Sequence, residues 1–177
     1  MQTAEMNIRL KSKSKALALA VCAILVSTAM SLTQSCSEVD CPLDNVVVMT
    51  CGLYDANGSE QNLTDSLTVM AAGTDSILLN GAQNVSSFAL PMNYVADVDT
   101  LIFKFTEVDG TSYIDTLRVS HTNEAHFESL DCPLSFFHEI KDVVTTHNAI
   151  DSVAIVRKQV NYEDVENLKI YLASHIE

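Results

Sequence analysis

The chain has 177 residues, of which 10 are Lys or Arg and 23 are Asp or Glu, so its formal net charge is −13. Residues 1–35 hold four of these basic residues and one acidic residue, so the other 142 residues carry six basic and 22 acidic side chains, a net charge of −16. Six basic residues cannot build the Lys/Arg stripe that a phosphate backbone requires, which excludes nucleic acid as a partner. A hydrophobic content of 47% excludes a disordered acidic tail, and the length predicts one globular domain.

The first segment of the chain has the pattern of an export signal. Lys11, Lys13 and Lys15 precede an apolar run at residues 16–30. As a helix, such a run would span about 22 Å, which is short of the roughly 30 Å hydrocarbon core of a bilayer. A basic segment followed by a short apolar one is typical of a removable signal rather than of a membrane span. We therefore predict that residues 1–35 form a signal peptide.

The end of this segment, Leu32-Thr33-Gln34-Ser35-Cys36, resembles a bacterial lipobox. In that motif, the Leu four residues before the Cys and the small residue directly before it guide lipidation of the Cys and cleavage ahead of it. The two middle residues match the relaxed motif that is usual in Bacteroidetes-type lipoproteins. The resemblance implies that Cys36 carries acyl chains such as palmitate, which contribute about 0.8 kcal/mol per buried methylene to anchoring. The alternative is plain cleavage nearby, which would leave Cys36 an ordinary thiol.

The rest of the chain is expected to consist of a lipidated tether, residues 36–44, and a single domain, residues 45–177. Residues 37–40 contain two carboxylates, and a short acidic run behind the lipidated Cys resembles the surface-export signal of the same lipoproteins. We expect the protein to be anchored in the outer membrane, facing either the periplasm or the cell surface. Its expected partners are the membrane, through the lipid anchor, and another envelope protein.

Beyond the tether, apolar and polar residues alternate, and turn residues interrupt the alternation about every ten residues. The segments expected to form strands are residues 45–54, 63–71, 76–79, 86–90, 100–108, 112–121, 134–144, 152–160 and 168–172. No segment has a convincing amphipathic helical pattern, although residues 123–130 are compatible with one helical turn. We predict an all-β fold, an antiparallel β-sandwich of Ig-like or Greek-key type with about eight or nine strands, and a β-barrel as the alternative.

The hairpin around Asp109-Gly110 is the most secure of these predictions, because this dipeptide favours a tight turn. In the strand before it, Leu101, Phe103 and Phe105 alternate with less apolar residues. Since side chains along a strand point alternately to opposite faces, these three are expected to face the core.

Several segments together resemble an uncharacterised family of small Bacteroidetes lipoproteins. They are the lipoprotein start, the early Cys-Pro, LeuTyrAspAlaAsnGly at residues 53–58, the AspThrLeu strand entries, AspCysPro at residues 131–133 and LeuLysIleTyrLeu at residues 168–172. The similarity covers residues 36–172. It implies a fold and a compartment, but the family carries no assigned activity and the resemblance therefore implies no mechanism.

Three cysteines remain once the signal is removed and Cys36 is lipidated, and they allow three pairings. The tetrapeptide AspCysProLeu contains Cys41 in its first copy and Cys132 in its second, and both copies lie in turn-like surroundings. Cys51 instead lies within a strand pattern. We therefore predict a Cys41–Cys132 disulfide, which an oxidising compartment would preserve, and a Cys51 that packs as a small apolar residue. The alternative is that all three thiols are reduced.

Acidic and histidine residues offer weak candidates for a metal site. His121, Glu124, His126 and Glu128 lie close together in sequence but lack the spacing of a zinc motif, and His121 is expected to be a half-buried packing residue. Residues 55–60 offer oxygen ligands for calcium, but their Gly is at the fourth position instead of the sixth of an EF-hand loop, and a hairpin turn is the simpler interpretation. We predict no metal and no cofactor.

A tripeptide of Asp, Ser or Thr, and an aliphatic residue occurs five times and resembles the O-glycosylation acceptor of exported Bacteroidetes proteins. Strand entries of a β-rich chain also favour this composition. The candidate acceptors are Ser66, Ser76, Thr100, Thr116 and Ser152, of which the first two are favoured.

No catalytic motif is evident, since the chain lacks Gly-x-Ser-x-Gly and any motif that would activate a Ser, Cys or Lys nucleophile. Trp is absent and aromatic residues make up 6% of the chain, which is poor material for stacking on sugar rings. We expect a non-enzymatic envelope lipoprotein that acts as an interaction or structural module. The alternatives are a glycan- or calcium-dependent binding module of a nutrient-uptake system and, third, a hydrolase with two close carboxylates.

Overall fold

A computed structural model describes residue 41 and residues 46–176 of the chain. The predicted signal peptide, the lipidated Cys36 and the rest of the tether lie outside the described residues. The described residues form no α-helix, and none of them belongs to a helix long and apolar enough to cross a membrane.

The described part of the chain folds into ten strands and is all-β, as predicted. The strands are β1 (Val48–Tyr54), β2 (Ser66–Ala71), β3 (Ile77–Ala82), β4 (Ser87–Pro91), β5 (Val98–Thr106), β6 (Ser112–His126), β7 (Ser135–Thr145), β8 (Ile150–Ile155), β9 (Gln159–Val160) and β10 (Glu166–Leu172). The segment predicted as one strand at residues 152–160 is divided into β8 and β9. The helical turn considered at residues 123–130 is absent, because β6 continues through His126.

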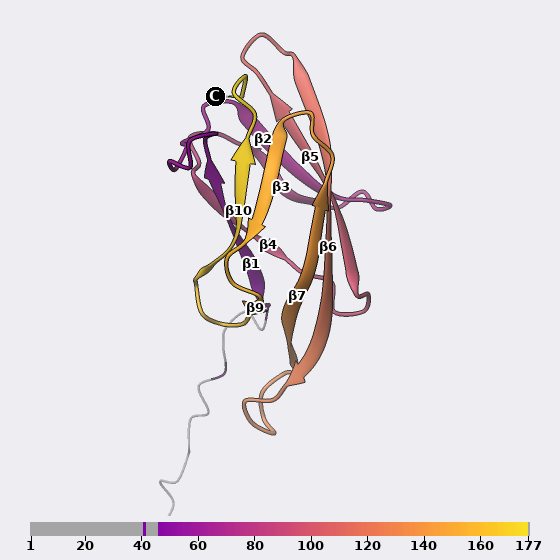
Figure 1. Ribbon diagram of the computed structural model, residues 1–177. Helices are drawn as coiled ribbons and strands as arrows, with labels where there is room; N and C mark the ends of the chain where they lie inside the picture. Colours follow the sequence, from indigo (N-terminus) through magenta and orange to yellow (C-terminus); the bar gives the residue numbers. More distant parts are fainter. Residues whose placement is uncertain (1–40, 42–45, 177) are drawn as a thin grey trace, which may run out of the picture. The chain divides into compact units, whose positions relative to one another are not determined.

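The strands form two sheets that face each other as a sandwich (Figure 1). The smaller sheet has the order β4-β1-β10-β8 and the larger one β3-β2-β5-β6-β7-β9. Neighbouring strands are antiparallel except for β1 and β10, which run parallel. The predicted sandwich is confirmed, but its smaller sheet is mixed. No hairpin joins the first strand to the last, so nothing local requires them to run in opposite directions.

The core lies between the two sheets. In β5, Leu101, Phe103 and Phe105 are buried at alternate positions, which confirms the predicted core face of this strand. The Phe88 ring on β4 of the smaller sheet lies 6.1 Å from the Phe103 ring, centroid to centroid, and joins the two layers. Cys51 on β1 is completely buried, as predicted for a small apolar residue, and burial raises the pKa of its thiol to about 12. Such a thiol is chemically unreactive near neutral pH.

The sandwich has two ends of different character. At the disulfide end, defined here by the loops at residues 92–97 and 127–134, β4 and β6 finish and β5 and β7 begin. At the turn end, β1, β5 and β7 finish in the turns at residues 55–58, 107–111 and 146–149. Figure 1 shows the disulfide end at the bottom and the C-terminus at the top.

The turn at residues 107–111 confirms the predicted hairpin. Glu107 N donates to Thr111 O at 2.9 Å, and Gly110 has a φ of 92°, a left-handed conformation that favours glycine. The Asp109 carboxylate accepts a hydrogen bond from Thr111 N at 2.8 Å, which holds the pKa of this carboxyl below its ordinary value. The sequence signal for this turn therefore corresponds to a real conformational requirement.

Candidate functional site at the disulfide end

The hairpin of β6 and β7 projects beyond its neighbours at the disulfide end. The pairing of β5 with β6 stops where Val98 faces Ser120, so the part of β6 beyond this position pairs with β7 alone. The register between β6 and β7 shifts between Ser120 and His121, and such a bulge bends the strand. The projecting hairpin, at the bottom of Figure 1, carries the loop at residues 127–134.

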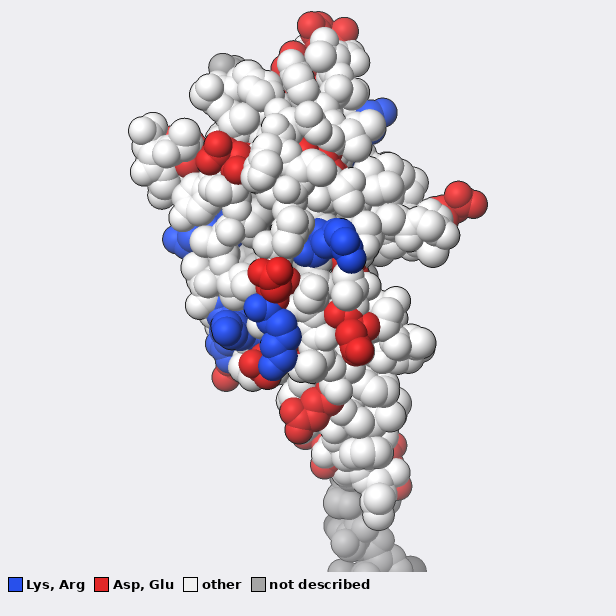
Figure 2. Space-filling view, turned by 45° about the vertical axis from the view of Figure 1, so that its right-hand side comes forward, with Lys and Arg blue, Asp and Glu red and all other residues white. Residues whose placement is uncertain are grey.

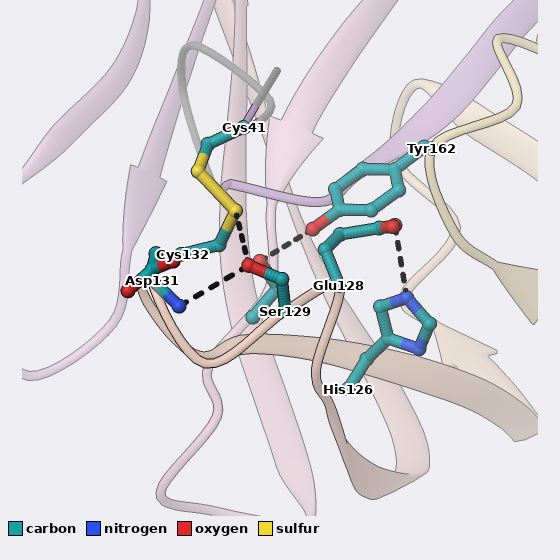
Figure 3. The surroundings of a disulfide bond; sticks show 8 residues. Cys41, His126, Glu128, Ser129, Asp131, Cys132 and Tyr162 are labelled. Carbon is teal, nitrogen blue, oxygen red and sulfur yellow. Dashed lines mark hydrogen bonds and ion pairs between the residues drawn. A yellow bond between two sulfur atoms is a disulfide. The ribbon is translucent and has the colours of Figure 1, made fainter. Parts of the chain in front are cut away.

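This loop is tied to Cys41 by a disulfide with Cys132, which confirms the predicted pairing. The two Cα atoms lie 5.5 Å apart and the cysteines are 91 residues apart in sequence. Ser129 organises the loop on the Cys132 side: Asp131 N donates to Ser129 Oγ at 3.1 Å, and Ser129 Oγ lies 3.6 Å from Cys132 Sγ (Figure 3). The loop is thus folded so that Cys132 meets Cys41, which lies within the predicted tether.

Aromatic rings support the hairpin on both of its faces. On one face, His126 stacks on Phe137 with 4.0 Å between ring centroids, and Tyr162 meets Phe137 edge-on at 5.1 Å. On the other face, Tyr94 stacks on Phe136 at 5.0 Å. Because neighbouring residues of a strand point to opposite faces, the two adjacent Phe residues support both layers.

An apolar pocket of about 440 Å³ lies beside the loop at residues 127–134. Its lining residues are Val46, Val47, Pro91, Met92, Tyr94, Leu134, Phe136 and His138. Tyr94 and Leu134 are exposed, whereas His138 is almost completely buried. The pocket therefore joins exposed apolar surface to a buried polar network.

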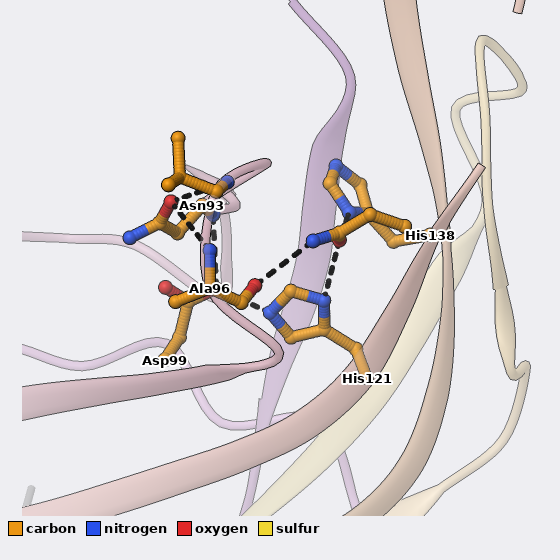
Figure 4. A network of polar contacts seen from close by, with 7 residues as sticks. Asn93, Ala96, Asp99, His121 and His138 are labelled. Atoms are coloured by element: carbon orange, nitrogen blue, oxygen red, sulfur yellow. Dashed lines mark hydrogen bonds and ion pairs between the residues drawn. The ribbon is translucent and has the colours of Figure 1, made fainter. Parts of the chain in front are cut away.

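In that network Asn123 contacts His121 and His138, the two buried histidines labelled in Figure 4. His121 Nδ1 and His138 Nδ1 lie 2.9 and 2.7 Å from Asn123 Oδ1. Since an amide oxygen only accepts hydrogen bonds, both rings carry a hydrogen on Nδ1 with the amide in this orientation. Asn123 Nδ2 donates to Ala96 O at 2.9 Å, so the network fastens the loop at residues 92–97 to β6.

The electrostatics of the network differ between the two histidines. Burial, together with the charge of His121, lowers the pKa of His138 to about 4, so His138 is neutral near pH 7. His121 Nε2 is buried, lies 3.2 Å from Asp99 Oδ2 and makes no hydrogen bond with the described residues. Asp99 Oδ2 also accepts a hydrogen bond from Asn93 N at 3.1 Å. His121 is only 2% exposed, so the expectation of a half-buried residue was wrong; the loop at residues 92–97 covers it.

No metal centre forms within the part of the chain that the structure describes, where no three His, Cys, Asp or Glu side chains converge. His126 Nε2 lies 3.0 Å from Glu128 Oε1, but this pair is partly exposed and lacks a third ligand of this kind (Figure 3). At the turn end, the Asp55 carboxylate accepts hydrogen bonds from Asn57 N at 2.9 Å and Ser59 N at 2.8 Å. The segment considered for calcium is therefore a hairpin turn whose first carboxylate is already engaged by backbone amides.

A buried carboxylate at the turn end is a feature that sequence reasoning missed. Asp115, near the start of β6, accepts hydrogen bonds from the backbone N atoms of Asn148, Ala149 and Ile150 at 2.9, 2.6 and 2.8 Å, and from Thr146 Oγ1. Burial pushes the pKa of Asp115 upward, but the hydrogen bonds from Thr146 and these amides outweigh it and hold the pKa below its ordinary value. The carboxylate fixes the turn between β7 and β8 and is not free for catalysis.

The five candidate acceptor residues for glycosylation lie in different environments. Ser76, between β2 and β3, and Ser152, on β8, are exposed. The other three are half-buried within strands of the larger sheet: Ser66 on β2, Thr100 on β5 and Thr116 on β6. Among the five, only Ser76 lies outside a strand, so its hydroxyl is the most accessible to a modifying enzyme.

Charge also distinguishes the disulfide end. On the face shown in Figure 2, Lys and Arg side chains lie on the upper and middle parts, and the lower end shows acidic side chains only. The projecting hairpin has the same character, because residues 120–138 include Glu124, Glu128 and Asp131 but no Lys or Arg. This end offers apolar and acidic surface and is unsuited to an anionic partner.

Two features of the structure, the histidine network and the buried Asp115, have a signal in the sequence that could have predicted them. His121 and Asn123 are two residues apart, so in a strand they point to the same face, but their contact with His138 depends on the register of β7. Asp115 was singled out only as part of a repeated tripeptide. Its position within a strand, where an unpaired carboxylate would be costly, was the sign of a buried partner.

Two sheets packed face to face, with a disulfide at one end and no helix among the described residues, define a small β-sandwich domain. A family model described as a family of unknown function, DUF6452, matches residues 66–172, and the chain belongs to this family. The expected membership of an uncharacterised family is confirmed. The match begins with β2 and ends with β10, so it includes Cys132 and both buried histidines but neither β1 nor Cys41. No curated protein and no solved structure matches the chain.

Proposed function

We propose that the protein is a non-enzymatic lipoprotein of the Bacteroidetes type, anchored in the outer membrane through acyl chains on Cys36. In this proposal the sandwich is an interaction or structural module of the cell envelope. The observation that carries the proposal is the segment Leu32-Thr33-Gln34-Ser35-Cys36, which follows a basic and then an apolar segment.

The disulfide supports export from the cytosol. Disulfides persist in oxidising compartments and are rare where thiols are kept reduced. The bond between Cys41 and Cys132 joins the domain to a point five residues after the proposed lipidation site. Both the presence of the disulfide and its position close to Cys36 are compatible with a domain that is anchored in the envelope.

The polar groups of the described site support a non-enzymatic role. His121 and His138 contact Asn123 and Asp99 rather than a Ser or Cys that they could activate. The Asp115 carboxylate is used to hold a turn. These groups maintain the fold, and the surface of the disulfide end is left for contact with another molecule.

The test is the intact mass of the protein extracted from membranes with detergent, with and without reductant. We expect a chain that begins at Cys36, carries the added mass of acyl chains, and gains two hydrogens on reduction. The matched control is Cys36→Ser, which should lose the acyl mass and leave the membrane fraction. A wild-type mass without acyl chains would contradict the proposal.

A binding partner in the envelope can be sought with the same material. Cross-linking in intact cells, followed by purification of the lipidated protein, should recover a specific envelope protein or the peptidoglycan layer. Recovery of the same material by Cys36→Ser would show that anchoring is not required. If neither preparation recovers a specific partner, the interaction role is contradicted.

Glycosylation of the exported domain is part of the same proposal, and the exposed hydroxyl of Ser76 supports it best. Mass increments of hexose size should appear on the extracted protein and should decrease in Ser76→Ala. Ser152→Ala is the matched control, because Ser152 is also exposed but lies within a strand. Peptide mapping that finds every candidate tripeptide unmodified would contradict this part of the proposal.

The alternative is a glycan- or calcium-dependent binding module, and a pocket at the turn end, lined by both polar and apolar residues, favours it. This pocket of about 480 Å³ is lined in part by Asp55, Asn57, Glu60, Gln61 and Asn62. A glycan array in the presence and absence of calcium tests this alternative. Binding that is lost in Glu60→Ala would support it, and a silent array at millimolar ligand would remove it.

A further inference from the structure

We propose that the loop at residues 127–134 rests on the lipid bilayer, with Phe127 and Leu130 in the headgroup region, so that the disulfide end of the sandwich faces the membrane. This inference rests on the proposed lipid anchor at Cys36. It adds a second contact with the membrane and an orientation of the domain.

The loop presents apolar side chains that the domain itself does not cover. Phe127 is 67% exposed, Leu130 is 102% exposed and Leu134 is 42% exposed. Leu134 also lines the apolar pocket together with Val46 and Tyr94, so the loop continues into further exposed apolar surface. An apolar surface of this kind usually marks a contact with another molecule or with a membrane.

The length of the chain between the anchor and the disulfide selects the bilayer as the occupant. Five residues lead from Cys36 to Cys41, and an extended chain of this length spans about 18 Å at most. The Cα atom of Cys41 lies 5.5 Å from that of Cys132, and Leu130 is two residues from Cys132. Once Cys36 is inserted in the membrane, the exposed loop cannot lie far from the headgroups.

The disulfide creates this proximity. Without it, the first point held by the fold is the buried Val47, eleven residues after Cys36, and the chain could span about 40 Å. With the disulfide, the first residue held by the fold is Cys41, and the domain is held at the loop between β6 and β7. The bond thus shortens the tether by more than half and attaches it at the projecting hairpin.

The charges of the loop indicate which lipid it would contact. Glu128 and Asp131 are in the loop, and residues 120–138 contain no Lys or Arg. Carboxylates are repelled by an anionic surface, so the contact is expected with zwitterionic headgroups and through apolar side chains. Contact with an anionic leaflet should be weaker.

Tryptophan fluorescence tests the inference directly, because the chain has no Trp. The mature lipidated protein, as Phe127→Trp or Leu130→Trp, is reconstituted in phosphatidylcholine vesicles with and without bromine on the upper acyl chain. The matched control is Val108→Trp, because Val108 is 94% exposed in the turn at residues 107–111, at the opposite end. Brominated lipid should reduce the emission of both loop variants about twofold and leave the control almost unchanged.

The disulfide supplies a second arm of the test. In Phe127→Trp combined with Cys41→Ser and Cys132→Ser, the longer tether should reduce the quenching by at least about half. Vesicles rich in anionic lipid should also reduce it. Quenching that is equally low for loop and control variants would overturn the inference, as would a blue-shifted loop emission that depends on protein concentration and not on bromine, since it would mean contact with a second copy of the chain.

The failure of this inference and that of the proposed function can be distinguished. The mass of each variant is measured before reconstitution, and absence of acyl chains would contradict the proposed anchor. Acylated protein that shows no bromine quenching at Phe127→Trp or Leu130→Trp would leave the anchor intact and overturn only the loop contact.

Discussion

The two ends of the sandwich are held by different means. At the turn end, Asp55, Asp109 and Asp115 accept backbone hydrogen bonds, and each carboxyl has a pKa below its ordinary value. At the disulfide end, a covalent bond, stacked rings and two buried histidines hold the loops, and one histidine nitrogen makes no hydrogen bond with the described residues.

The difference shows that a small β-domain can stabilise the turns at one end with carboxylates and leave the other end for contact. Asp55 and Asp109 accept hydrogen bonds from amides of their own turns, whereas Asp115 on β6 holds the turn between β7 and β8. The disulfide end instead exposes apolar side chains and depends on a link to a distant part of the chain. The contact surface and the long-range link are therefore at the same end.

Removal of the disulfide should have the largest effect. In the chain-entropy model, a bond that closes a loop of 91 residues stabilises the folded state by about 4–5 kcal/mol. Cys41→Ser combined with Cys132→Ser should lose this amount of unfolding free energy in urea titrations. Cys51→Ala is the control, since it retains the bond and should lose only about 1 kcal/mol. A wild-type unfolding midpoint that reductant does not change would contradict this prediction.

Loss of the buried carboxylate at the turn end should come next. Asp115→Ala leaves the backbone N–H groups of Ala149 and Ile150 buried without their acceptor, at a cost of about 3–4 kcal/mol. Asp109→Ala, at an exposed turn, should cost much less stability, because solvent can replace the lost hydrogen bond. Urea unfolding of the two variants at pH 7 measures the difference.

The pH dependence of this effect has a definite sign. The folded-state pKa of Asp115 lies below its ordinary value of 3.8, so its stabilisation is present above that value and is lost as pH falls through the folded-state pKa. The stability difference between wild type and Asp115→Ala should therefore shrink only under strongly acidic conditions. A difference that vanished already at pH 5 would contradict the role assigned to the carboxylate.

The disulfide end should weaken at milder acidity. Burial lowers the pKa of His138 to about 4, against an ordinary value of 6.5 in the unfolded chain. Between these values the unfolded state binds a proton that the folded state does not, so stability falls as pH falls, by about 2 kcal/mol from pH 6.5 to pH 5. His138→Gln should remove most of this dependence. An NMR titration that places the His138 pKa near 6.5 would contradict it.

The smallest expected effect is in the turn at residues 55–58. Gly58 has a φ of 83°, which an L-amino acid with a side chain adopts at a cost of about 1 kcal/mol. Gly58→Ala should therefore lower stability slightly and leave fluorescence quenching at the disulfide end unchanged. A large loss of stability would show that this turn holds more of the fold than its local hydrogen bonds indicate.

The alternation of apolar and polar residues was sufficient to predict the strands that have one face toward the core. The strand with Leu101, Phe103 and Phe105 was predicted correctly because the opposite sheet imposes burial on alternate residues. The last part of β6, up to His126, was not predicted, because it faces a loop rather than a sheet and its residues show no apolar alternation. Apolar alternation therefore predicts a strand only as far as the strand faces the opposite sheet.

The candidate site could be predicted only where local signals exist. The pairing of Cys41 with Cys132 was predicted because the same tetrapeptide surrounds both, whereas the network of His121, Asn123 and His138 depends on the register of two strands. A register shift at His121 changes which residues meet across the hairpin. Such contacts are properties of the folded sheets and are not encoded in any short segment.

The parallel pairing of β1 with β10 has a consequence for biosynthesis. Because β1 lies between β4 and β10 in the smaller sheet, that sheet stays incomplete until β10 has been synthesised. A chain truncated before β10 would leave one side of β1 unpaired and would leave β8 without its neighbour in the smaller sheet. For a chain exported as proposed above, folding of this domain would therefore require translocation of β10, and a chain that stopped before this strand would stay open to proteases.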